Sequence, residues 1–542
     1  MKLPVLPRVA AHSLTLIVAV FLAAVPNQTF WHHFVAATDG APGVQLASFV
    51  VVAMVFNMLL SVASLPYLQK PVLMLILVCS AAASYFVDRY GVQIDKAMIQ
   101  NVVETDMREA TELFNLRFVA TLLLLGALPA LLVARTPVHY DTVRRQAVKA
   151  GGWFLLSLAI AAALLFAFSK TLAPALREHR ELRFLLAPTN YLQAVNGYVR
   201  QKLAQPVVVA PLGTDALRGP AWTAQGRRTV TVIVVGETAR AVNFSLNGYA
   251  RNTNPELARQ DGLVNFSNVE SCGSATAVSV PCVFSALGRG AYSDSKARSQ
   301  EGLLDVLSHA GFRVVWRDNN SGCKGVCDRV ERVDVSVPVA GNAMCGADEC
   351  YDERLLAGLP DLIRSSTRDL VVVLHQKGSH GPDYYKRYPA RYARFGPVCE
   401  TNELEKCERA AIVAAYDNSI LYTDHVLSSA IDLLREAGQR EDVDTALLYF
   451  SDHGESLGEK SMYLHGAPMI VAPSEQTHVP MMLWMSDRFA QRFHIDQRCL
   501  SARSAQPFSH DNVFHSVLGM LNVSTAVYDS SLDLIQACTR GA

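Results

Sequence analysis

Five long runs without a charged side chain lie in the first third of the chain, and they constrain the fold more than any other feature. They cover residues 9–34, 46–65, 71–87, 118–134 and 152–168. Each is roughly 17–25 residues long, the length that an α-helix needs to cross about 30 Å of hydrocarbon. Soluble helices carry a polar stripe, and these runs carry none. The sequence therefore predicts five membrane-spanning helices, since a cleaved signal peptide would account for the first run alone.

The distribution of basic residues predicts the side of the membrane on which each end lies, because Lys and Arg favour cytoplasmic loops. With a cytoplasmic N-terminus, the inside segments contain Lys2, Arg8, Lys70, Arg135, Arg144, Arg145 and Lys149. The outside loops contain fewer basic residues, and the loop between the third and fourth runs also contains six acidic ones. Five spans place the termini on opposite sides, so we expect the C-terminal two-thirds outside the cytoplasm.

Cysteine usage supports the same placement. Cys79 lies in the third run, and the other ten cysteines all follow residue 271. An even number of closely spaced cysteines is typical of disulfides in an oxidising compartment. Zinc–thiolate clusters are the alternative, and they would need a reducing compartment. Pairing of neighbours predicts five bridges: Cys272–Cys282, Cys323–Cys327, Cys345–Cys350, Cys399–Cys407 and Cys499–Cys538.

Composition divides the chain and excludes some functions. Lys plus Arg and Asp plus Glu each number 49, so the chain lacks the basic excess of a nucleic-acid binder. An amphipathic stretch over 176–203 is followed by a segment interrupted by Pro206, Pro211, Gly213 and Pro220. We therefore expect a transmembrane domain over 1–172, an interfacial bridging helix and linker over 173–225, and a soluble domain over 226–542.

The soluble domain alternates apolar strand-like runs with helical stretches such as 409–437. The runs cover 229–236, 312–316, 369–374 and 446–450, and polar residues follow each of them. Unbroken apolar strands between helices predict an α/β domain with a mostly parallel sheet that is buried on both faces. Sites in such folds lie at the carboxyl ends of the strands, where Glu237, His375, Asp452 and His453 fall.

Glu237, Asp452 and His453 offer two carboxylates and one imidazole as metal ligands. This mixture suits Zn²⁺, and with more oxygen ligands Mn²⁺ or Mg²⁺. A helix-start carboxylate and an ordinary turn are the alternatives for each residue taken alone. His380 and His465 each stand beside a glycine that permits close approach to a ligand, so a second metal site or phosphate contacts could use them.

The segment 271–282 is dense in hydroxyl groups. A hydroxyl becomes a useful nucleophile when a metal or a helix N-terminus lowers its pKa. An N-cap role is the alternative, because Ser and Thr favour that position. Composition does not choose between Ser271, Ser274, Thr276 and Ser279.

Taken together, these motifs resemble those of the membrane-bound phosphoethanolamine transferases of Gram-negative bacteria. This group of the alkaline phosphatase superfamily includes lipid A-modifying enzymes and the mobile colistin-resistance enzymes. The matching segments are Val235-Gly236-Glu237-Thr238, Cys272-Gly273-x-x-Thr276 through Pro281-Cys282, Trp316-Arg317-Asp318-Asn319-Asn320, His375-Gln376-x-Gly378-x-His380-Gly381-Pro382 and Ser451-Asp452-His453-Gly454-Glu455-Ser456-Leu457-Gly458. The resemblance covers essentially the whole chain and implies a five-helix transmembrane domain joined to an alkaline phosphatase/sulfatase-like α/β domain.

The resemblance also implies roles for individual residues. Thr276 would be the nucleophile, and Glu237, Thr276, Asp452 and His453 would bind the main zinc ion. Lys324, His380 and His465 would bind phosphate, with the two histidines as acid and base or as ligands of a second zinc. Asn101, Thr105 and Glu109 would receive the ethanolamine head, and a polar surface helix is the alternative for that loop.

The implied function is zinc-dependent transfer of phosphoethanolamine from phosphatidylethanolamine to lipid A through a threonine intermediate. The transfer would reduce the negative charge of the outer membrane and give resistance to polymyxin and other cationic peptides. The expected protein is a multi-pass monomer of the bacterial inner membrane, with a cytoplasmic N-terminus and a periplasmic catalytic domain.

Several alternatives stay open. The acceptor could be a core sugar of lipopolysaccharide, or the chain could be a membrane-anchored phosphodiesterase of the same superfamily. A sulfatase would need a Cys-x-Pro-x-Arg segment, which is absent around Pro281-Cys282-Val283. The loop at 100–105 and the cysteine set argue against a glycerol phosphate transferase. An inactive membrane sensor would be expected to lack Thr276 or a metal ligand, and all of them are present.

Overall fold

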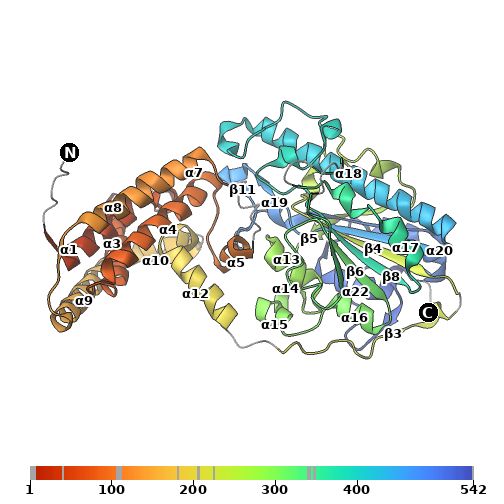
Figure 1. The fold of residues 1–542 in the computed structure, drawn as a ribbon, viewed down its shortest axis with the longest axis horizontal. Coiled ribbons are helices and arrows are strands. Elements are labelled where there is room, and N and C mark those ends of the chain that lie inside the picture. Colours follow the sequence, from red (N-terminus) through yellow and green to blue (C-terminus); the bar gives the residue numbers. More distant parts are fainter. Residues whose placement is uncertain are drawn as a thin grey trace. The chain divides into compact units, whose positions relative to one another are not determined.

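A computed structural model describes residues 8–38, 42–104, 113–179, 182–203, 208–223, 226–338, 343–345 and 349–539. The chain forms two compact units (Figure 1). The first contains Met1–Ile99 and Phe114–Arg200, and the second contains Gln100–Leu113 and Gln201–Ala542.

The first unit is a bundle of apolar helices. Its long elements are α3 (Pro42–Ser61), α4 (Gln69–Tyr90), the continuous segment of α7 (Leu116–Thr121), η1 (Leu122–Ala127) and α8 (Leu128–Arg135), and α9 (Val143–Ala167). Each of these four is long and apolar enough to cross a membrane. They correspond to the second to fifth predicted spans.

The first predicted span is not one straight helix. Residues 9–34 divide between α1 (Ala11–Ala24) and α2 (Gln28–Ala37), which meet at an angle of 65°. Pro26 lies at the break and has no N–H to donate to the preceding turn. The Asn27 amide instead donates to the carbonyls of Leu22 and Ala187, each at 2.7 Å. The described residues therefore contain four candidate spans, or five if the bent pair counts as one.

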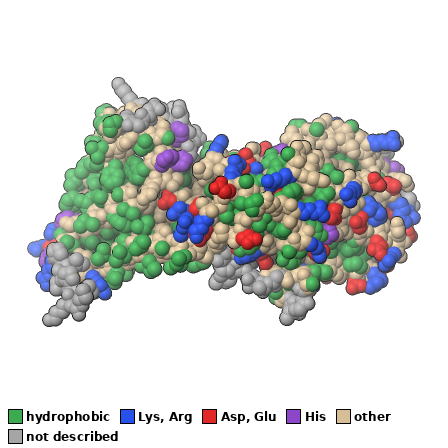
Figure 2. Space-filling view, turned by 90° about the horizontal axis from the view of Figure 1, so that it is seen from above, with side chains coloured by type: hydrophobic (Ala, Val, Ile, Leu, Met, Phe, Trp, Pro, Cys, Tyr) green, Lys and Arg blue, Asp and Glu red, His purple; other side chains and the backbone are tan. Residues whose placement is uncertain are grey.

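Large apolar side chains cover the outer surface of this bundle (Figure 2). Val62, Leu124 and Phe166 are 72%, 62% and 85% exposed. Exposed apolar surface of this extent is unfavourable in water and suits contact with lipid. The helix packing inside includes a polar contact, in which the Gln69 amide donates to the Ala11 carbonyl and to the Thr15 hydroxyl at 2.7 and 2.9 Å.

The segment after α9, where the sequence predicts an interfacial bridging helix and linker over 173–225, forms several helices. It contains α10 (Ser169–Glu178), α11 (Leu182–Leu185) and α12 (Thr189–Leu203). Pro188 separates the last two helices, because a proline disfavours helical geometry in the residue before it and cannot donate a backbone hydrogen bond. The amphipathic stretch over 176–203 is thus divided among three helices, and its interfacial role stays a prediction.

The second unit contains an eight-stranded sheet in the order β13-β5-β12-β9-β4-β8-β6-β7. The strands are β4 (Thr229–Gly236), β5 (Val264–Glu270), β6 (Arg313–Asp318), β7 (Glu331–Asp334), β8 (Leu370–His375), β9 (Asp444–Ser451), β12 (His478–Met485) and β13 (Phe508–Ser509). From β9 to β7 all neighbours are parallel, whereas β12 runs antiparallel to β9 and β5. The predicted mostly parallel α/β sheet is confirmed.

The register brings the carboxyl ends of four strands together. Gly236 of β4 pairs with Ser451 of β9, and the preceding Val235 pairs with His375 of β8. His375 in turn pairs with Asp318 of β6. Residues that directly follow these strands therefore lie at one edge of the sheet.

Helices cover both faces of this sheet (Figure 1). The 32-residue α18 (Arg409–Arg440) packs on one face against β9. The opposite face joins the core of α13 (Thr276–Val283), α16 (Leu303–His309) and α22 (Asp511–Met520). The shorter helices of this unit are α14 (Gly288–Ala291), α15 (Asp294–Arg298), α19 (Ser474–Thr477), α20 (Asp487–Arg492) and α21 (Gln497–Arg503), together with α17 (Leu359–Ser365), which packs against α18.

Five disulfides link neighbours in this unit, as the sequence analysis predicted: Cys272–Cys282, Cys323–Cys327, Cys345–Cys350, Cys399–Cys407 and Cys499–Cys538. Among the described residues, Cys79 is the cysteine left unbridged. Cys323 and Cys327 also lie near Asp328. Because both sulfurs are bridged, they offer no thiolates to a metal.

Candidate active site

Thr276 is the first residue of α13 and lies at the carboxyl edge of the sheet. Its Oγ1 is 3.2 and 3.1 Å from the two carboxylate oxygens of Glu237, which follows β4. The same Oγ1 is 3.2 Å from Nε2 of His453, which follows β9. Thr276 is buried at 9% exposure. The structure thus places the predicted nucleophile directly against two of its predicted zinc ligands.

Asp452 completes this group. Its Oδ1 accepts backbone N–H groups from Thr238 at 3.2 Å and His453 at 2.7 Å. Its Oδ2 is buried without a hydrogen-bond partner among the described residues and lies 3.4 Å from Nε2 of His453. A buried unpaired carboxylate oxygen is unfavourable unless a cation or proton satisfies it.

The chemistry of this donor set fits a zinc ion. One ligand atom from each of Glu237, Asp452 and His453 lies within 4.8 Å of the others. The His453 Nδ1 is 2.8 Å from the Gly454 carbonyl, which favours a proton on Nδ1 and leaves Nε2 as the ligand atom. Two carboxylates, one imidazole and the Thr276 oxygen form a mixed O/N set of the kind that zinc accepts.

Electrostatics at the site also favours a cation. Burial opposes ionisation of Glu237, but the hydrogen bond and the charge of His453, together with the neighbouring His380 and His465, outweigh it and hold the pKa of Glu237 well below its usual range. Burial and the Glu237 charge raise the pKa of Asp452 to about 6. Burial would lower the pKa of His453, but the Asp452 charge and the Glu237 hydrogen bond raise it to about 10. The pocket therefore attracts positive charge, which a proton or a metal ion can supply.

Asn320, which follows β6, supports Glu237 from behind. The Asn320 amide donates to Glu237 Oε2 at 2.7 Å and to the Gln376 carbonyl at 2.8 Å. Behind it, His375 Nδ1 lies 3.3 Å from Asp318. Sequence reasoning placed Asn320 and His375 near the site but gave them no role, because only the fold shows what they contact.

Gly378 allows the chain to pass close to Glu237. Its φ is +57°, and a Cβ built there would lie 2.5 Å from the Glu237 carbonyl oxygen and 2.9 Å from its nitrogen. Asp352, which sequence reasoning missed, holds this turn by accepting the Lys377 and Gly378 N–H groups at 2.8 and 2.9 Å. Glycine is therefore required at this position for steric reasons.

His380 and His465 lie beside the proposed zinc ligand His453. The His465 ring centroid is 4.5 Å from that of His453 and 5.3 Å from that of His380. His465 Nδ1 is 2.9 Å from Glu455 Oε2, while the Tyr384 hydroxyl donates to Glu455 Oε1 at 2.7 Å. This carboxylate–imidazole pair favours a proton on Nδ1 and leaves Nε2 for chemistry. Sequence reasoning quoted Glu455 in a motif but did not identify it as a site residue.

Lys324 lies on the loop bridged by Cys323 and Cys327. Its ammonium donates to the Ser321 carbonyl and hydroxyl at 3.1 and 3.0 Å. Lys324 and Ala277, the residue after Thr276, line the same cavity of about 320 Å³. The structure therefore brings this predicted phosphate-binding cation to the start of α13.

The predicted ethanolamine-binding loop is described only in part. Asn101 lies in α5 (Lys96–Glu104). Thr105 and Glu109 lie outside the described residues. Roles for all three residues stay predictions.

His510 is a further buried residue that the sequence did not indicate. Its Nδ1 accepts the Cys272 N–H at 3.1 Å, and its Nε2 donates to the Ser451 carbonyl at 3.0 Å. Burial lowers the pKa of His510 to about 3, so the ring is neutral. It joins the disulfide-linked segment before Thr276 to the end of β9.

Comparison with known proteins identifies the family of this chain. A family model described as "Phosphoethanolamine transferase EptA/EptB" matches residues 52–203, and one described as "Sulfatase" matches residues 229–523. The phosphoethanolamine transferase EptA of Escherichia coli K12 is 42% identical over 494 residues, which are 91% of this chain and 89% of that protein. The chain belongs to the phosphoethanolamine transferase family.

Other family members give the same result. Phosphatidylethanolamine transferase Mcr-1 of Escherichia coli is 40% identical over 479 residues, which are 86% of this chain and 88% of that protein. The solved lipooligosaccharide phosphoethanolamine transferase A of Neisseria meningitidis has a TM-score of 0.93 at 36% identity, and the match covers 99% of this chain and 100% of that one. The family resemblance and the fold class predicted from the sequence are confirmed.

Proposed function

We propose that this protein transfers phosphoethanolamine from phosphatidylethanolamine to a phosphate of lipid A, through a covalent intermediate on Thr276. The observation that carries the proposal is the position of Thr276 Oγ1, which lies within 3.2 Å of both Glu237 and His453 Nε2. A buried hydroxyl between a carboxylate and an imidazole is the arrangement expected for an activated nucleophile.

The surroundings of Thr276 suit a phosphoryl group. Thr276 begins an eight-residue helix whose first N–H groups can bind phosphate oxygens. Lys324 lines a cavity together with Ala277, the residue after Thr276, and adds a positive charge. His380 and His465 lie on the side of His453 and supply further donors.

Glu237, Asp452, His453 and Thr276 would together hold one zinc ion. When bound, zinc lowers the pKa of a coordinated hydroxyl and neutralises charge on the phosphoryl oxygens. The unpaired Asp452 Oδ2 supports this assignment. A second zinc, held by His380 and His465, stays a prediction of the family resemblance.

The reaction would take place in two displacements at phosphorus. In the first, Thr276 Oγ1 attacks the phosphorus of phosphatidylethanolamine, and its proton passes to the neighbouring Glu237 carboxylate. The bond from phosphorus to the glycerol oxygen breaks. His465 Nε2, oriented by Glu455, donates a proton to the departing diacylglycerol. In the second, a phosphate oxygen of lipid A gives its proton to His465 Nε2 and attacks the phosphothreonine, and Thr276 leaves with the proton that the carboxylate returns. Ping-pong kinetics follow from this order.

Relatives support the lipid substrates. The name of Mcr-1 includes phosphatidylethanolamine, and the Neisseria enzyme is named for lipooligosaccharide. A second candidate acceptor is a sugar of the lipopolysaccharide core, since Kdo(2)-lipid A phosphoethanolamine 7''-transferase of Escherichia coli K12 is 29% identical over 486 residues. The choice of lipid A in this proposal rests on the family resemblance of the sequence.

The proposed location is the bacterial inner membrane, with the N-terminus cytoplasmic and a monomeric enzyme facing the periplasm. The domain boundaries predicted from the sequence are part of this proposal. Transfer adds an amine to lipid A and reduces its net negative charge. Polymyxin and other cationic peptides would then bind the outer membrane less strongly.

Mass spectrometry of lipopolysaccharide from cells that express the wild type, Thr276→Val or Thr445→Val tests this proposal. Thr445 is a matched control, because it is a buried threonine of β9 whose hydroxyl lacks a hydrogen-bond partner among the described residues. We expect one added phosphoethanolamine on lipid A with the wild type and Thr445→Val, and none with Thr276→Val. Addition to core sugars would overturn the acceptor, and addition by Thr276→Val would overturn the nucleophile.

A further inference from the structure

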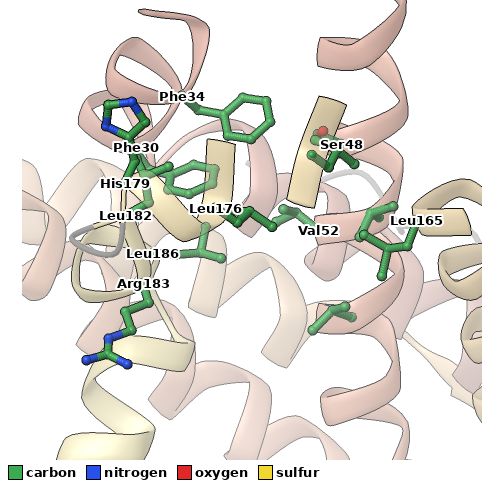
Figure 3. A pocket seen from close by; sticks show the side chains of 13 residues that line it. Phe30, Phe34, Ser48, Val52, Leu165, Leu176, His179, Leu182, Arg183 and Leu186 are labelled. Atoms are coloured by element: carbon green, nitrogen blue, oxygen red, sulfur yellow. The ribbon is translucent and has the colours of Figure 1, made fainter. Parts of the chain in front are cut away.

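An apolar cavity of about 500 Å³ lies inside the first unit. Its walls include Phe30 and Phe34 of α2, Val52 of α3, Leu165 of α9 and Leu176 of α10, whose side chains surround a common space (Figure 3). Protein interiors are usually packed to the density of organic crystals, and this volume falls in the range of about 300–1,000 Å³ that is typical of ligand pockets.

A histidine and an arginine stand at the edge of this apolar space. His179 and Arg183 both line it, and the Arg183 side chain extends away from the phenylalanines (Figure 3). The Arg183 guanidinium lies over the Phe184 ring at 4.5 Å from its centroid. This stacking fixes the position of the guanidinium and leaves its N–H edge available for an anion.

A second cavity of about 420 Å³ shares Arg183 with the first. Most of its lining residues are polar or charged, and they include Lys96 at the start of α5 and Arg200 of α12. Asp95 also lines it, but one of its oxygens already accepts the Met98 N–H at 2.9 Å at the N-terminus of α5. Among the described residues of this lining, three are cations and one is a carboxylate, which makes the cavity suitable for an anionic group.

We propose that the two cavities together bind one glycerophospholipid, with an acyl chain in the apolar cavity and its phosphate beside Arg183, Lys96 and Arg200. Both cavities belong to the first unit. The site is therefore built without Thr276 or any of the proposed zinc ligands, and it does not depend on the proposed transfer reaction.

The shape of the site favours this lipid class over other ligands. Arg183 lines both cavities, so it joins an apolar space to a cationic one, as a ligand with a tail and a phosphate requires. Free phosphate would leave the apolar cavity unfilled, and diacylglycerol would leave the cations without an anion. Lipid A carries several acyl chains, and one cavity of about 500 Å³ is too small to hold all of them.

The position of the cavity along the bundle fits a leaflet of the membrane. The α3 residues that line the cavity begin at Ser48, in the first half of that helix, and Leu165 lies in the last turn of α9. The site is therefore near the end of the bundle at which α9 terminates. In the proposed topology this is the periplasmic end, so the lipid would come from the outer leaflet of the inner membrane.

Photo-cross-linking to the full-length protein in detergent tests the proposal. The probe is phosphatidylglycerol with a diazirine in one acyl chain, and cross-linked peptides are identified by mass spectrometry. Val52→Trp fills the apolar cavity, and Arg183→Gln removes the shared cation. Leu59→Trp and Arg135→Gln are matched controls, because Leu59 is an exposed residue of α3 and Arg135 ends α8, and neither lines the two cavities.

We expect cross-links in the segments 28–37, 48–55 and 165–186. Each cavity variant should weaken labelling about tenfold. Arg183→Gln loses one charged contact with the phosphate, and Val52→Trp loses the space for the acyl chain. Both control variants and Thr276→Ala should label like the wild type. Thr276→Ala separates this site from the proposed function, because it removes the transfer reaction and leaves the cavities intact.

Three results would overturn the proposal. Equal labelling of the cavity and control variants would mean that the cavities do not select the probe. Equal labelling by a diazirine-bearing diacylglycerol would remove the role of the phosphate. Complete competition by inorganic phosphate, or stronger competition by lipid A than by unlabelled phosphatidylglycerol, would assign the site to a different ligand.

Discussion

Gly378→Ala should inactivate the enzyme without any change to a proposed ligand or nucleophile. An alanine Cβ would lie 2.5 Å from the Glu237 carbonyl oxygen, and this neighbour is backbone rather than the end of a flexible side chain. Ordinary carbon contacts begin near 3.5 Å, so Glu237 must move by roughly 1 Å. A misplacement of this size at a catalytic group can cost about 100-fold in rate. We expect that loss together with reduced zinc content.

Gly358→Ala provides the matched control for this variant. Gly358 also has a positive φ of +75°, but a Cβ there meets nothing within 4 Å. Both substitutions carry the backbone strain of about 1–2 kcal/mol for a left-handed alanine, and Gly378→Ala alone adds the collision. Transfer activity, zinc content and thermal unfolding would be measured for the two proteins. Equal activity and zinc content in both would refute the claim that Gly378 sets the position of Glu237.

Three further predictions follow from contacts in the second unit. Glu455→Gln should lower the transfer rate about 10- to 100-fold and alter its pH profile, because His465 loses the carboxylate that orients it. Tyr384→Phe, which removes the other hydrogen bond to Glu455, should have a smaller effect. Equal effects of the two variants would contradict the role of Glu455 in orienting His465. His425 hydrogen-bonds to Glu353 and to Glu256, and these contacts raise its pKa. That stabilisation is full below about pH 6.5 and disappears as pH rises through the higher folded pKa, so His425→Gln should lower the Tm more at pH 6 than at pH 9, and a pH-independent loss would argue against it. Replacing both cysteines of a disulfide by serine should cost more stability when the bridge closes a longer loop. We expect a loss of about 4 kcal/mol for Cys499–Cys538, with 39 residues of separation, and of about 2 kcal/mol for Cys323–Cys327, with four. Denaturant unfolding would check the order of the two losses, and the reverse order would contradict the loop-entropy reasoning.

The sequence predicted that Glu237, Asp452 and His453 lie together, because the end of a strand can be recognised from the local sequence. Each of β4 and β9 is an unbroken apolar run, and the residue that follows such a run lies at the carboxyl edge of a parallel sheet. Glu237, Asp452 and His453 could therefore be placed together before their distances were known. Thr276 could be chosen among four hydroxyls only through the family resemblance.

Other parts of the site depend on contacts between distant segments. Asn320 reaches Glu237 across 83 positions of the chain, and His510 reaches Cys272 across 238. No periodicity or spacing encodes such pairs. The break between α1 and α2 was also missed, because an apolar run shows that a segment can lie in lipid but not that it is straight.

The central claim is that Thr276 carries the phosphoethanolamine group between donor and acceptor. The most direct measurement is peptide mass spectrometry of the full-length enzyme after incubation with phosphatidylethanolamine and no acceptor, followed by addition of lipid A. We predict a phosphoethanolamine adduct on Thr276 that forms with the donor alone and disappears when lipid A is added. An adduct on another residue, or transfer that proceeds with Thr276 unmodified at every time point, would contradict the proposed mechanism.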